Sequence, residues 1–367
     1  MLKDTLKIIT AILLLMTVIT GCDNKTEQTN EPNTLQDSVS NESSLNENEL
    51  YNEIFDNVTK GDVKFSFDNF EEEEIIREYK NVVSEHPELF WLGDGYSYET
   101  VTDNNGKTVT FECAHIPMQN ITEKRAEFDS IVEKIVNGAN SQKTPYEKVI
   151  YIHDYIIDNT QYDQETYKKM NESKDSKEIY EATTAYGCLL NNKAVCSGYS
   201  AAFQLLMQKL GIKSGRVSGR KSDGEDHEWN YIVLDNEYYY VDVTWDDPIN
   251  DGIQDNKTYE FFCITTDELN KTHEIDNDQF IPECTAKKYD YYIYNNLYLE
   301  RYNYDEFKKI YNNANDMIAV KFSNAKELEN ALNDLVEGQK IYNIAEGKHS
   351  CTYSVGTGGL VLSIMLK

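Results

Sequence analysis

The stretch Asn192-Lys193-Ala194-Val195-Cys196-Ser197-Gly198-Tyr199 places a single cysteine at a junction between two kinds of structure. After it, apolar residues recur at helical spacing and end at a glycine: Tyr199, Phe203, Leu206, Leu210 and Gly211. We therefore expect Cys196 at or just before the N-terminus of a helix. The unsatisfied N–H groups at that end stabilise a thiolate, which is the nucleophilic form of cysteine. Position alone does not identify a catalytic residue, because a lone cysteine is more often buried and inert.

A β-hairpin is predicted downstream of this helix. Residues 226–234 and 238–245 are rich in β-forming side chains, and an Asp-Asn step between them can form a two-residue turn. With this turn, the period of two in a strand puts His227 and Asp242 on one face as diagonal neighbours, roughly 7 to 8 Å apart at the backbone. Buried strands rarely carry His or Asp, and a structural hydrogen-bonded pair is the alternative to a functional one.

Together these three residues supply what thiol acyl transfer requires. A cysteine nucleophile needs a histidine that takes the thiol proton and later protonates the leaving amine. An aspartate then fixes the imidazole tautomer and stabilises the imidazolium. The sequence therefore predicts a catalytic triad of Cys196, His227 and Asp242.

The residues around this triad resemble the bacterial transglutaminase-like superfamily. Four blocks occur in the order and spacing of that family: residues 192–200, 210–219, 227–230 and 240–248. The resemblance covers about residues 144–266 when the preceding helix with His153-Asp154-Tyr155 is counted. It implies an α+β fold with a papain-like transglutaminase core, made of a helical part and an antiparallel sheet and flanked by small α+β regions. It also implies that Cys196 is the nucleophile, His227 the general base and acid, and Asp242 the orienting residue.

Other parts of the site are less defined. The backbone N–H of Cys196 would supply one donor to the oxyanion. The second donor stays open among three residues, for which packing or loop roles are the alternative: Tyr186, Asn191 and Asn192. Three aromatic residues are candidates for binding substrate, although an aromatic residue in a core element is more often simply core: Trp229, Trp245 and Tyr186.

No cofactor or metal ion is expected. The loop at residues 246–255 is acidic, but it lacks the spacing of an EF-hand and is typical of a solvated loop. No CxxC or His-rich spacing of a zinc site occurs. Five cysteines remain besides Cys22 and Cys196, so at least one is expected to be free or intermolecular: Cys113, Cys188, Cys263, Cys284 and Cys351.

The N-terminus carries the features of a bacterial lipoprotein signal. Lys3 and Lys7 precede an apolar run from Ile8 to Ile19, which is too short to span a bilayer, and Thr20-Gly21-Cys22 follows. This end resembles a lipobox, in which Cys22 is lipidated and becomes the first mature residue. An ordinary secretory signal with a chance cysteine is the alternative. We expect the protein on the outer face of the bacterial cytoplasmic membrane, held there only by its lipid anchor.

Length and composition bound the architecture. The chain has 367 residues, with 64 acidic and 35 basic side chains and a formal net charge of -29, which argues against a nucleic-acid binder. At this length we expect several folded regions. We predict five segments: a signal peptide at 1–21, a disordered tether at 22–48, an N-terminal α+β region at 49–140, the catalytic core at 141–275 and a Tyr-rich C-terminal α+β region at 276–367.

Local patterns describe the two flanking regions. Residues 96–102 and 107–115 flank an Asn-Asn-Gly turn and predict a hairpin. Near the C-terminus we expect two helices and two strands: helices at 305–312 and 325–335, and strands at 317–322 and 360–365. Dense tyrosines between Tyr289 and Tyr304 are typical of sugar contact or, equally, of a Tyr-rich core. We interpret His273 as a structural histidine.

Two functions from different classes fit these patterns. The first is a surface-anchored thiol acyl-transfer enzyme that hydrolyses or crosslinks peptide or side-chain amide bonds in peptides, proteins or cell-wall peptides. The second is a non-catalytic cell-wall or protein-binding lipoprotein built on a transglutaminase-like scaffold. We favour the enzyme, because an inert domain has no chemical need for all three triad residues. Many bacterial members of the family resemble thiol hydrolases, which favours hydrolysis over crosslinking. The sequence predicts no particular oligomeric state.

Overall fold

A computed structural model describes residues 37–103, 106–115, 120–172, 177–250, 253–254, 257–276, 281–312, 317–344 and 348–366. The predicted signal peptide and the predicted tether up to residue 36, with Cys22, lie outside these described residues. Among the described helices, none is both long enough and apolar enough to cross a bilayer.

The first helix overlaps the predicted tether. Helix α1 (Asp37–Lys60) begins within the segment predicted at 22–48 and continues into the N-terminal region. Its second half buries Leu50, Ile54 and Val58, which recur at helical spacing. Once such a segment is fixed by packing, each further residue adds a helical hydrogen bond at little entropic cost. The helix therefore extends backwards into a polar stretch that has no packing signal of its own.

The N-terminal region contains a small antiparallel sheet and one further helix. Its elements are β1 (Lys64–Asp68), α2 (Glu72–Glu85), β2 (Leu92–Asp103) and β3 (Gly106–His115). The strands lie in the order β1-β3-β2. Asp103 pairs with Gly106, which confirms the predicted hairpin, although the two asparagines of its turn lie outside the described residues.

A set of helices forms one half of the central domain. They are α3 (Ile121–Asn140), α4 (Pro145–Asn159), α5 (Gln164–Asn171), α6 (Lys177–Ala182), α7 (Ala185–Leu189) and α8 (Cys196–Lys209). Thr144 and Glu147 form a capping box that starts α4, as its Thr-Pro opening predicts. Two short strands, β4 (Gln161–Tyr162) and β5 (Lys193–Ala194), pair in parallel and set Tyr162 opposite Ala194, two residues before Cys196.

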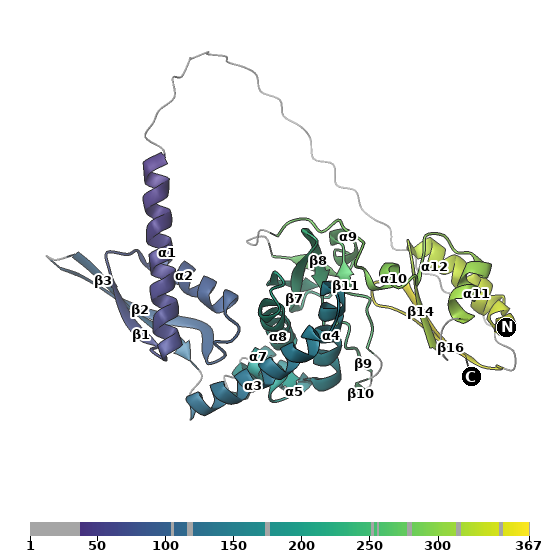
Figure 1. Ribbon diagram of the computed structural model, residues 1–367, viewed down its shortest axis with the longest axis horizontal. Helices are drawn as coiled ribbons and strands as arrows, with labels where there is room; N and C mark the ends of the chain where they lie inside the picture. Colours follow the sequence, from purple (N-terminus) through teal and green to yellow (C-terminus); the bar gives the residue numbers. More distant parts are fainter. Residues whose placement is uncertain are drawn as a thin grey trace, which may run out of the picture. The chain divides into compact units, whose positions relative to one another are not determined.

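The other half is a five-stranded sheet in the order β11-β8-β7-β6-β12. Its strands are β6 (Ser214–Lys221), β7 (Asp226–Leu234), β8 (Glu237–Val241), β11 (Phe262–Ile264) and β12 (His273–Ile275). Helices α4 and α8 lie beside β7, β8 and β11 (Figure 1), and most of α8 is buried there. Helical and antiparallel halves together make an α+β core of papain-like type.

The central hairpin has the predicted register. Leu234 pairs with Glu237 across the turn, whose two residues, Asp235 and Asn236, both have positive φ values of 52° and 65°. Such backbone is typical of the two-residue turn that matches strand twist. The ladder ends where Asn230 pairs with Val241, so Asp242 lies just beyond the regular pairing.

Between the sheet and the C-terminal region the chain forms β9 (Ile249–Asn250), β10 (Ile253–Gln254), α9 (Thr266–Leu269) and α10 (Tyr291–Tyr294). The tyrosines of α10 pack against the central domain. Tyr291 stacks on Tyr259 and Tyr294 stacks on Tyr146, each with ring centroids 3.8 Å apart. At this segment the tyrosines contribute to packing, which supports the core interpretation over sugar contact.

The C-terminal region has its own apolar core and a four-stranded sheet in the order β13-β14-β16-β15. Its elements are β13 (Tyr298–Leu299), α11 (Tyr304–Asn312), β14 (Met317–Phe322), α12 (Ala325–Leu332), β15 (Cys351–Val355) and β16 (Val361–Leu366), with a π-helical turn at Asn333–Glu337 and a 3-10 turn at Lys340–Asn343. Helices α11 and α12 lie beside β14 and β16 (Figure 1). The sequence patterns missed β13 and β15.

Buried charges join the C-terminal region to the central domain. The Lys321 ammonium on β14 contacts Asp290 Oδ2 at 2.5 Å and Glu268 Oε1 at 2.8 Å, and Lys321 is only 2% exposed. In addition, the backbone N–H of Gly358, in the turn between β15 and β16, donates to Glu260 Oε1 at 3.0 Å. Removing either partner of a buried ion pair is strongly destabilising, so these contacts hold the two regions together.

Candidate active site

Cys196 is the first residue of α8, as the sequence predicts. Val195 before it is extended, with φ −98° and ψ −179°, so the chain enters the helix abruptly. A Cβ atom at Gly198 would lie 2.4 Å from the Ala182 carbonyl oxygen, so only glycine allows the start of α8 to pack this closely on the preceding segment. Cys196 stays partly exposed while the helix behind it is buried.

The structure brings Cys196, His227 and Asp242 together. His227 Nε2 lies 2.6 Å from Asp242 Oδ2, and both side chains are almost fully buried. Cys196 lies beside the imidazole, where its thiol helps to raise the pKa of His227. Because Nε2 faces the carboxylate, Nδ1 is the ring nitrogen left for the sulfur. Sulfur, imidazole and carboxylate thus follow one another in the order that the predicted triad requires.

Asp242 has two further partners that fix its orientation. The backbone N–H of Trp245 donates to Oδ1 at 3.0 Å, and Nε2 of His273 lies 3.1 Å from Oδ2. His273 Nδ1 in turn contacts Thr272 Oγ1 at 2.8 Å. The sequence analysis interpreted His273 as purely structural, and the structure instead places it in direct contact with the predicted orienting residue. No local pattern marks this contact, because His273 sits on a short edge strand.

The electrostatics of this cluster favour an ion pair. Burial alone would lower the pKa of His227, but the Asp242 carboxylate and hydrogen bonds to Asp242 and Cys196 raise it to about 10. Burial would raise the pKa of Asp242, but His227 and His273 hold it well below its usual range. His227 is therefore protonated at neutral pH. An adjacent imidazolium and a helix N-terminus both favour the thiolate form of a cysteine.

The His227, Asp242 and His273 ring nitrogens and carboxylate oxygens lie close enough together to hold a metal ion. Their separations are those of hydrogen bonds, at 2.6 and 3.1 Å, and each imidazole has a further partner, Cys196 for one and Thr272 for the other. These contacts account for the hydrogen-bonding capacity of the group. We therefore interpret it as a hydrogen-bond network that orients His227.

A second network supports the loop behind Asp242. Asp246 is fully buried and contacts His153 Nε2 at 3.2 Å, while the backbone N–H of Phe261 donates to it at 3.0 Å. Burial would lower the pKa of His153, but Asp154 and Asp246 raise it. The segment that carries Asp242 and Trp245 is thus held by this second network as well as by the hydrogen bonds of Asp242 itself.

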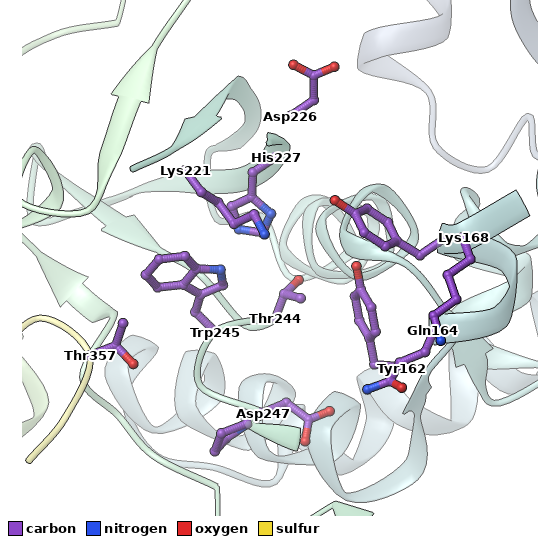
Figure 2. A pocket seen from close by; sticks show the side chains of 12 residues that line it. Tyr162, Gln164, Lys168, Lys221, Asp226, His227, Thr244, Trp245, Asp247 and Thr357 are labelled. Atoms are coloured by element: carbon purple, nitrogen blue, oxygen red, sulfur yellow. The ribbon is translucent and has the colours of Figure 1, made fainter. Parts of the chain in front are cut away.

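A hollow of about 520 Å³ opens beside His227. Figure 2 shows Trp245, Thr244 and His227 on one side of it, Tyr162 on the other, and Thr357 of the C-terminal region at its edge. We call it the Trp245 hollow. The Trp245 ring lies 5.8 Å from the imidazole of His227, centroid to centroid, so this predicted substrate residue does line the site.

The other predicted substrate residues lie elsewhere. Trp229 is 1% exposed and packs its ring behind His227 and His273. Tyr186 is 4% exposed, stacks on Phe90 and accepts a hydrogen bond from Lys124. Neither lines the Trp245 hollow, and the burial of both favours the packing role that the sequence analysis gave as the alternative. Asn191 and Asn192 lie in an exposed turn before β5, where Asn191 donates to Glu181 and Asn192 has a positive φ of 56°.

Six described cysteines are all unpaired, so no disulfide forms among them. Burial raises the pKa of Cys113, Cys188 and Cys284 to about 12, which keeps these thiols neutral and unreactive. Cys196 differs from them in being partly exposed and in lying beside the His227 imidazole.

Residues 130–243 match the family model of the transglutaminase-like superfamily, and this span contains Cys196, His227 and Asp242. The chain contains a transglutaminase-like domain. A human protein named Kyphoscoliosis peptidase is 26% identical over 169 residues, which are 42% of this chain and 24% of the length of the peptidase. A solved structure titled as that of a TGase is 17% identical, with a TM-score of 0.33, and the match covers 45% of this chain and 47% of that one.

The transglutaminase-like domain thus supplies the sulfur, the imidazole and the carboxylate, and the family is one of thiol-dependent enzymes. Trp245 and His273 lie beyond the matched span, on the segment that follows it. Part of the lining of the Trp245 hollow comes from outside the span that the family model matches, since Thr357 belongs to the turn between β15 and β16.

Proposed function

We propose that this protein is a surface-anchored thiol enzyme that hydrolyses peptide or side-chain amide bonds through a thioester on Cys196. The placement of Cys196 beside His227, which is hydrogen-bonded to Asp242, next to an open hollow carries the proposal. Peptides, proteins or cell-wall peptides are the substrates that this chemistry serves.

Acylation begins when the Cys196 sulfur attacks the amide carbonyl carbon and the carbonyl electrons move to oxygen. His227, protonated at neutral pH, gives its proton to the leaving amine as the tetrahedral intermediate collapses. Asp242 stabilises the imidazolium and keeps Nε2 protonated. In the second half a water molecule gives a proton to His227 and attacks the thioester, which releases the acid and restores the sulfur.

Two donors would stabilise the oxyanion. The first is the backbone N–H of Cys196, which has no carbonyl partner one turn earlier because the helix begins there. For the second we propose the Tyr162 hydroxyl. Strand pairing places Tyr162 beside the residues that precede Cys196, and its ring projects into the Trp245 hollow (Figure 2). Burial and then the nearby Cys196 charge raise the pKa of Tyr162, so its hydroxyl keeps the proton that it would donate.

Hydrolysis is proposed over crosslinking because water can reach the thioester. Cys196 is partly exposed and lines a hollow of about 690 Å³, which we call the Cys196 hollow. Partition of an acyl-enzyme depends on how well the site excludes water. An open hollow on the sulfur favours attack by water unless a bound amine occupies that space.

Iodoacetamide labelling followed by peptide mapping tests the proposal. We expect fast alkylation of Cys196 near neutral pH and slow alkylation of Cys351, which is also partly exposed but has no imidazole partner among its described contacts. His227→Ala should abolish the difference, whereas His115→Ala, on the N-terminal hairpin, should not. Equal slow reaction of both thiols in the wild-type protein would contradict a thiol enzyme and favour a binding role.

A further inference from the structure

A third hollow, of about 330 Å³, lies next to the Cys196 hollow. We call it the apolar hollow. Its lining is largely hydrophobic and includes Val83, Leu89, Phe90, Leu92, Met170 and Ala201. Binding pockets for whole ligands start at about 300 Å³, so this volume suits one large side chain with its adjoining backbone rather than a large ligand.

The apolar hollow adjoins the candidate catalytic site. Ser197, Met170 and Glu228 line both it and the Cys196 hollow. Tyr167 and His227 line both the Cys196 hollow and the Trp245 hollow. The three hollows thus lie next to one another along Cys196, and we call them together the groove. Tyr167 and Met170 are one turn apart on α5, so one face of this helix forms one side of the groove.

One wall of the apolar hollow comes from the N-terminal region, outside the span matched by the family model. Side chains of the central domain bind this wall by donating hydrogen bonds to the last carbonyls of α2. Gln204 donates to the Ser84 carbonyl at 3.1 Å, and Gln208 donates to the Glu85 carbonyl at 2.9 Å. Carbonyls at a helix C-terminus have no partners within the helix, so these bonds both satisfy and fix α2.

A polar group is also present at this wall. Arg216 donates through Nη2 to the Val83 carbonyl at 3.3 Å and pairs with Glu228 at 3.6 Å. Its Nε atom is buried and makes no hydrogen bond within the described part of the chain.

We propose that the apolar hollow binds a large apolar side chain of a polypeptide substrate, within about three residues of the amide that Cys196 attacks. This inference rests on the proposed function and names the substrate class for the same site. Ser197, adjacent to Cys196, already lines the hollow, and an extended peptide advances about 3.3 Å per residue. The occupant is therefore the substrate itself, an extended chain lying in the groove.

The test uses alanine-based peptides with a central glutamine and a single phenylalanine moved along the chain. Mass spectrometry follows both peptide cleavage and conversion of the glutamine to glutamate. We expect one placement of phenylalanine to raise kcat/KM roughly 10- to 200-fold over the all-alanine host, the range that apolar pockets give. Val83→Phe, which fills the hollow, should reduce this preference to less than about threefold. Val101→Phe, on the exposed strand β2, is the matched control and should keep it.

Two further measurements separate failure of this inference from failure of the proposed function. A short activated ester needs only the chemistry at Cys196, so its hydrolysis by the wild-type protein tests the proposed function apart from the hollow. Peptide binding to the Cys196→Ala protein, followed by fluorescence anisotropy, needs no chemistry and should show the same phenylalanine preference. Should Val83→Phe not fold, Met170→Glu tests the same hollow, with Met317→Glu as its exposed control. A flat preference in both turnover and binding, or a preference unchanged in the filled hollow, overturns the inference.

Discussion

His273 Nε2 lies 3.1 Å from Asp242 Oδ2, the same carboxylate oxygen that faces His227. Two imidazoles thus share one oxygen, while the other oxygen accepts the Trp245 backbone N–H. Both oxygens of the Asp242 carboxylate therefore have hydrogen-bond partners, which fix the orientation of the carboxylate. This arrangement makes His273 a positioning residue, acting on His227 through Asp242.

Replacement of His273 separates positioning from packing. His273→Leu should lower kcat about tenfold with little change in KM, because Asp242 loses one donor while the substrate walls stay intact. His273→Gln should restore most of the loss, since its amide nitrogen can donate where Nε2 does. Steady-state kinetics on an active ester and thermal melting of both variants provide the measurement. If the two variants lose activity equally and in proportion to stability, His273 only packs.

Asp242→Asn should impair turnover severely and leave the fold in place. The amide nitrogen would donate toward His227 Nε2 and force the ring proton onto Nδ1, which could then not accept the thiol proton. In analogous serine triads the same change lowers kcat about 10⁴-fold, and we expect roughly 10³ to 10⁴ in single-turnover acylation. Asp226→Asn, at the exposed start of β7, serves as the control. Acylation at the wild-type rate would show that Asp242 is only structural.

Tyr162→Phe tests the second oxyanion donor. Loss of one such donor lowers kcat about 10²- to 10³-fold, because it stabilises charge that develops only in the transition state. KM and the alkylation rate of Cys196 should change little. Tyr167→Phe removes a hydroxyl that donates to Glu225 at the surface and should be far milder. Equal kcat values for the two variants would exclude Tyr162 as a donor.

Glu260 should make the stability of the protein depend on pH. Burial, with a further contribution from Asp246, raises its pKa to about 7 from an ordinary 4.5. The folded state therefore holds a proton that the unfolded state has lost, and this stabilisation disappears as pH rises from about 4.5 through 7. Glu260→Gln should raise the free energy of unfolding by up to about 3 kcal/mol at pH 8 and by little at pH 4.5.

Urea denaturation at the two pH values measures this difference for Glu260→Gln. Glu237→Gln, at an exposed position on β8, is the control and should behave alike at both. The same stability change at pH 4.5 and pH 8 would mean that Glu260 does not carry a raised pKa.

Cys22→Ala tests the anchor. Two acyl chains hold a protein on a membrane far more firmly than one, so the wild-type protein should remain in the membrane fraction through high-salt washing. The variant should move to the soluble extracytoplasmic fraction, or stay unprocessed. A processed variant that remained equally membrane-bound would contradict lipidation at Cys22.

Much of the candidate site could be predicted because its signals are local. The Asp-Asn turn sets the register of β7 and β8, and helical spacing places Cys196 at the start of α8. The ladder stops at Val241, although the predicted strand continued to residue 245, yet His227 and Asp242 still meet. A two-residue hairpin leaves little freedom for residues just beyond its ends.

Contacts between distant segments could not be predicted in the same way. His273 reaches Asp242 only because β12 pairs with β6 at the sheet edge, and no periodic pattern announces such a short strand. Tyr162 is brought near Cys196 by two-residue strands. The apolar hollow needs the end of α2 and the start of α8 side by side, which depends on packing between regions far apart in the chain.

The C-terminal region completes one edge of the groove, because Thr357 lines the Trp245 hollow. During synthesis, Cys196, His227 and Asp242 emerge well before Lys321, whose ammonium neutralises the buried Asp290 and Glu268. Thr357, which closes one edge of the Trp245 hollow, emerges later still. A nascent chain that ends before β14 therefore carries all three reactive groups without a finished substrate wall. We therefore expect substrate binding in the Trp245 hollow to require residues 317–366, and cleavage within this segment to lower turnover while Cys196, His227 and Asp242 stay intact.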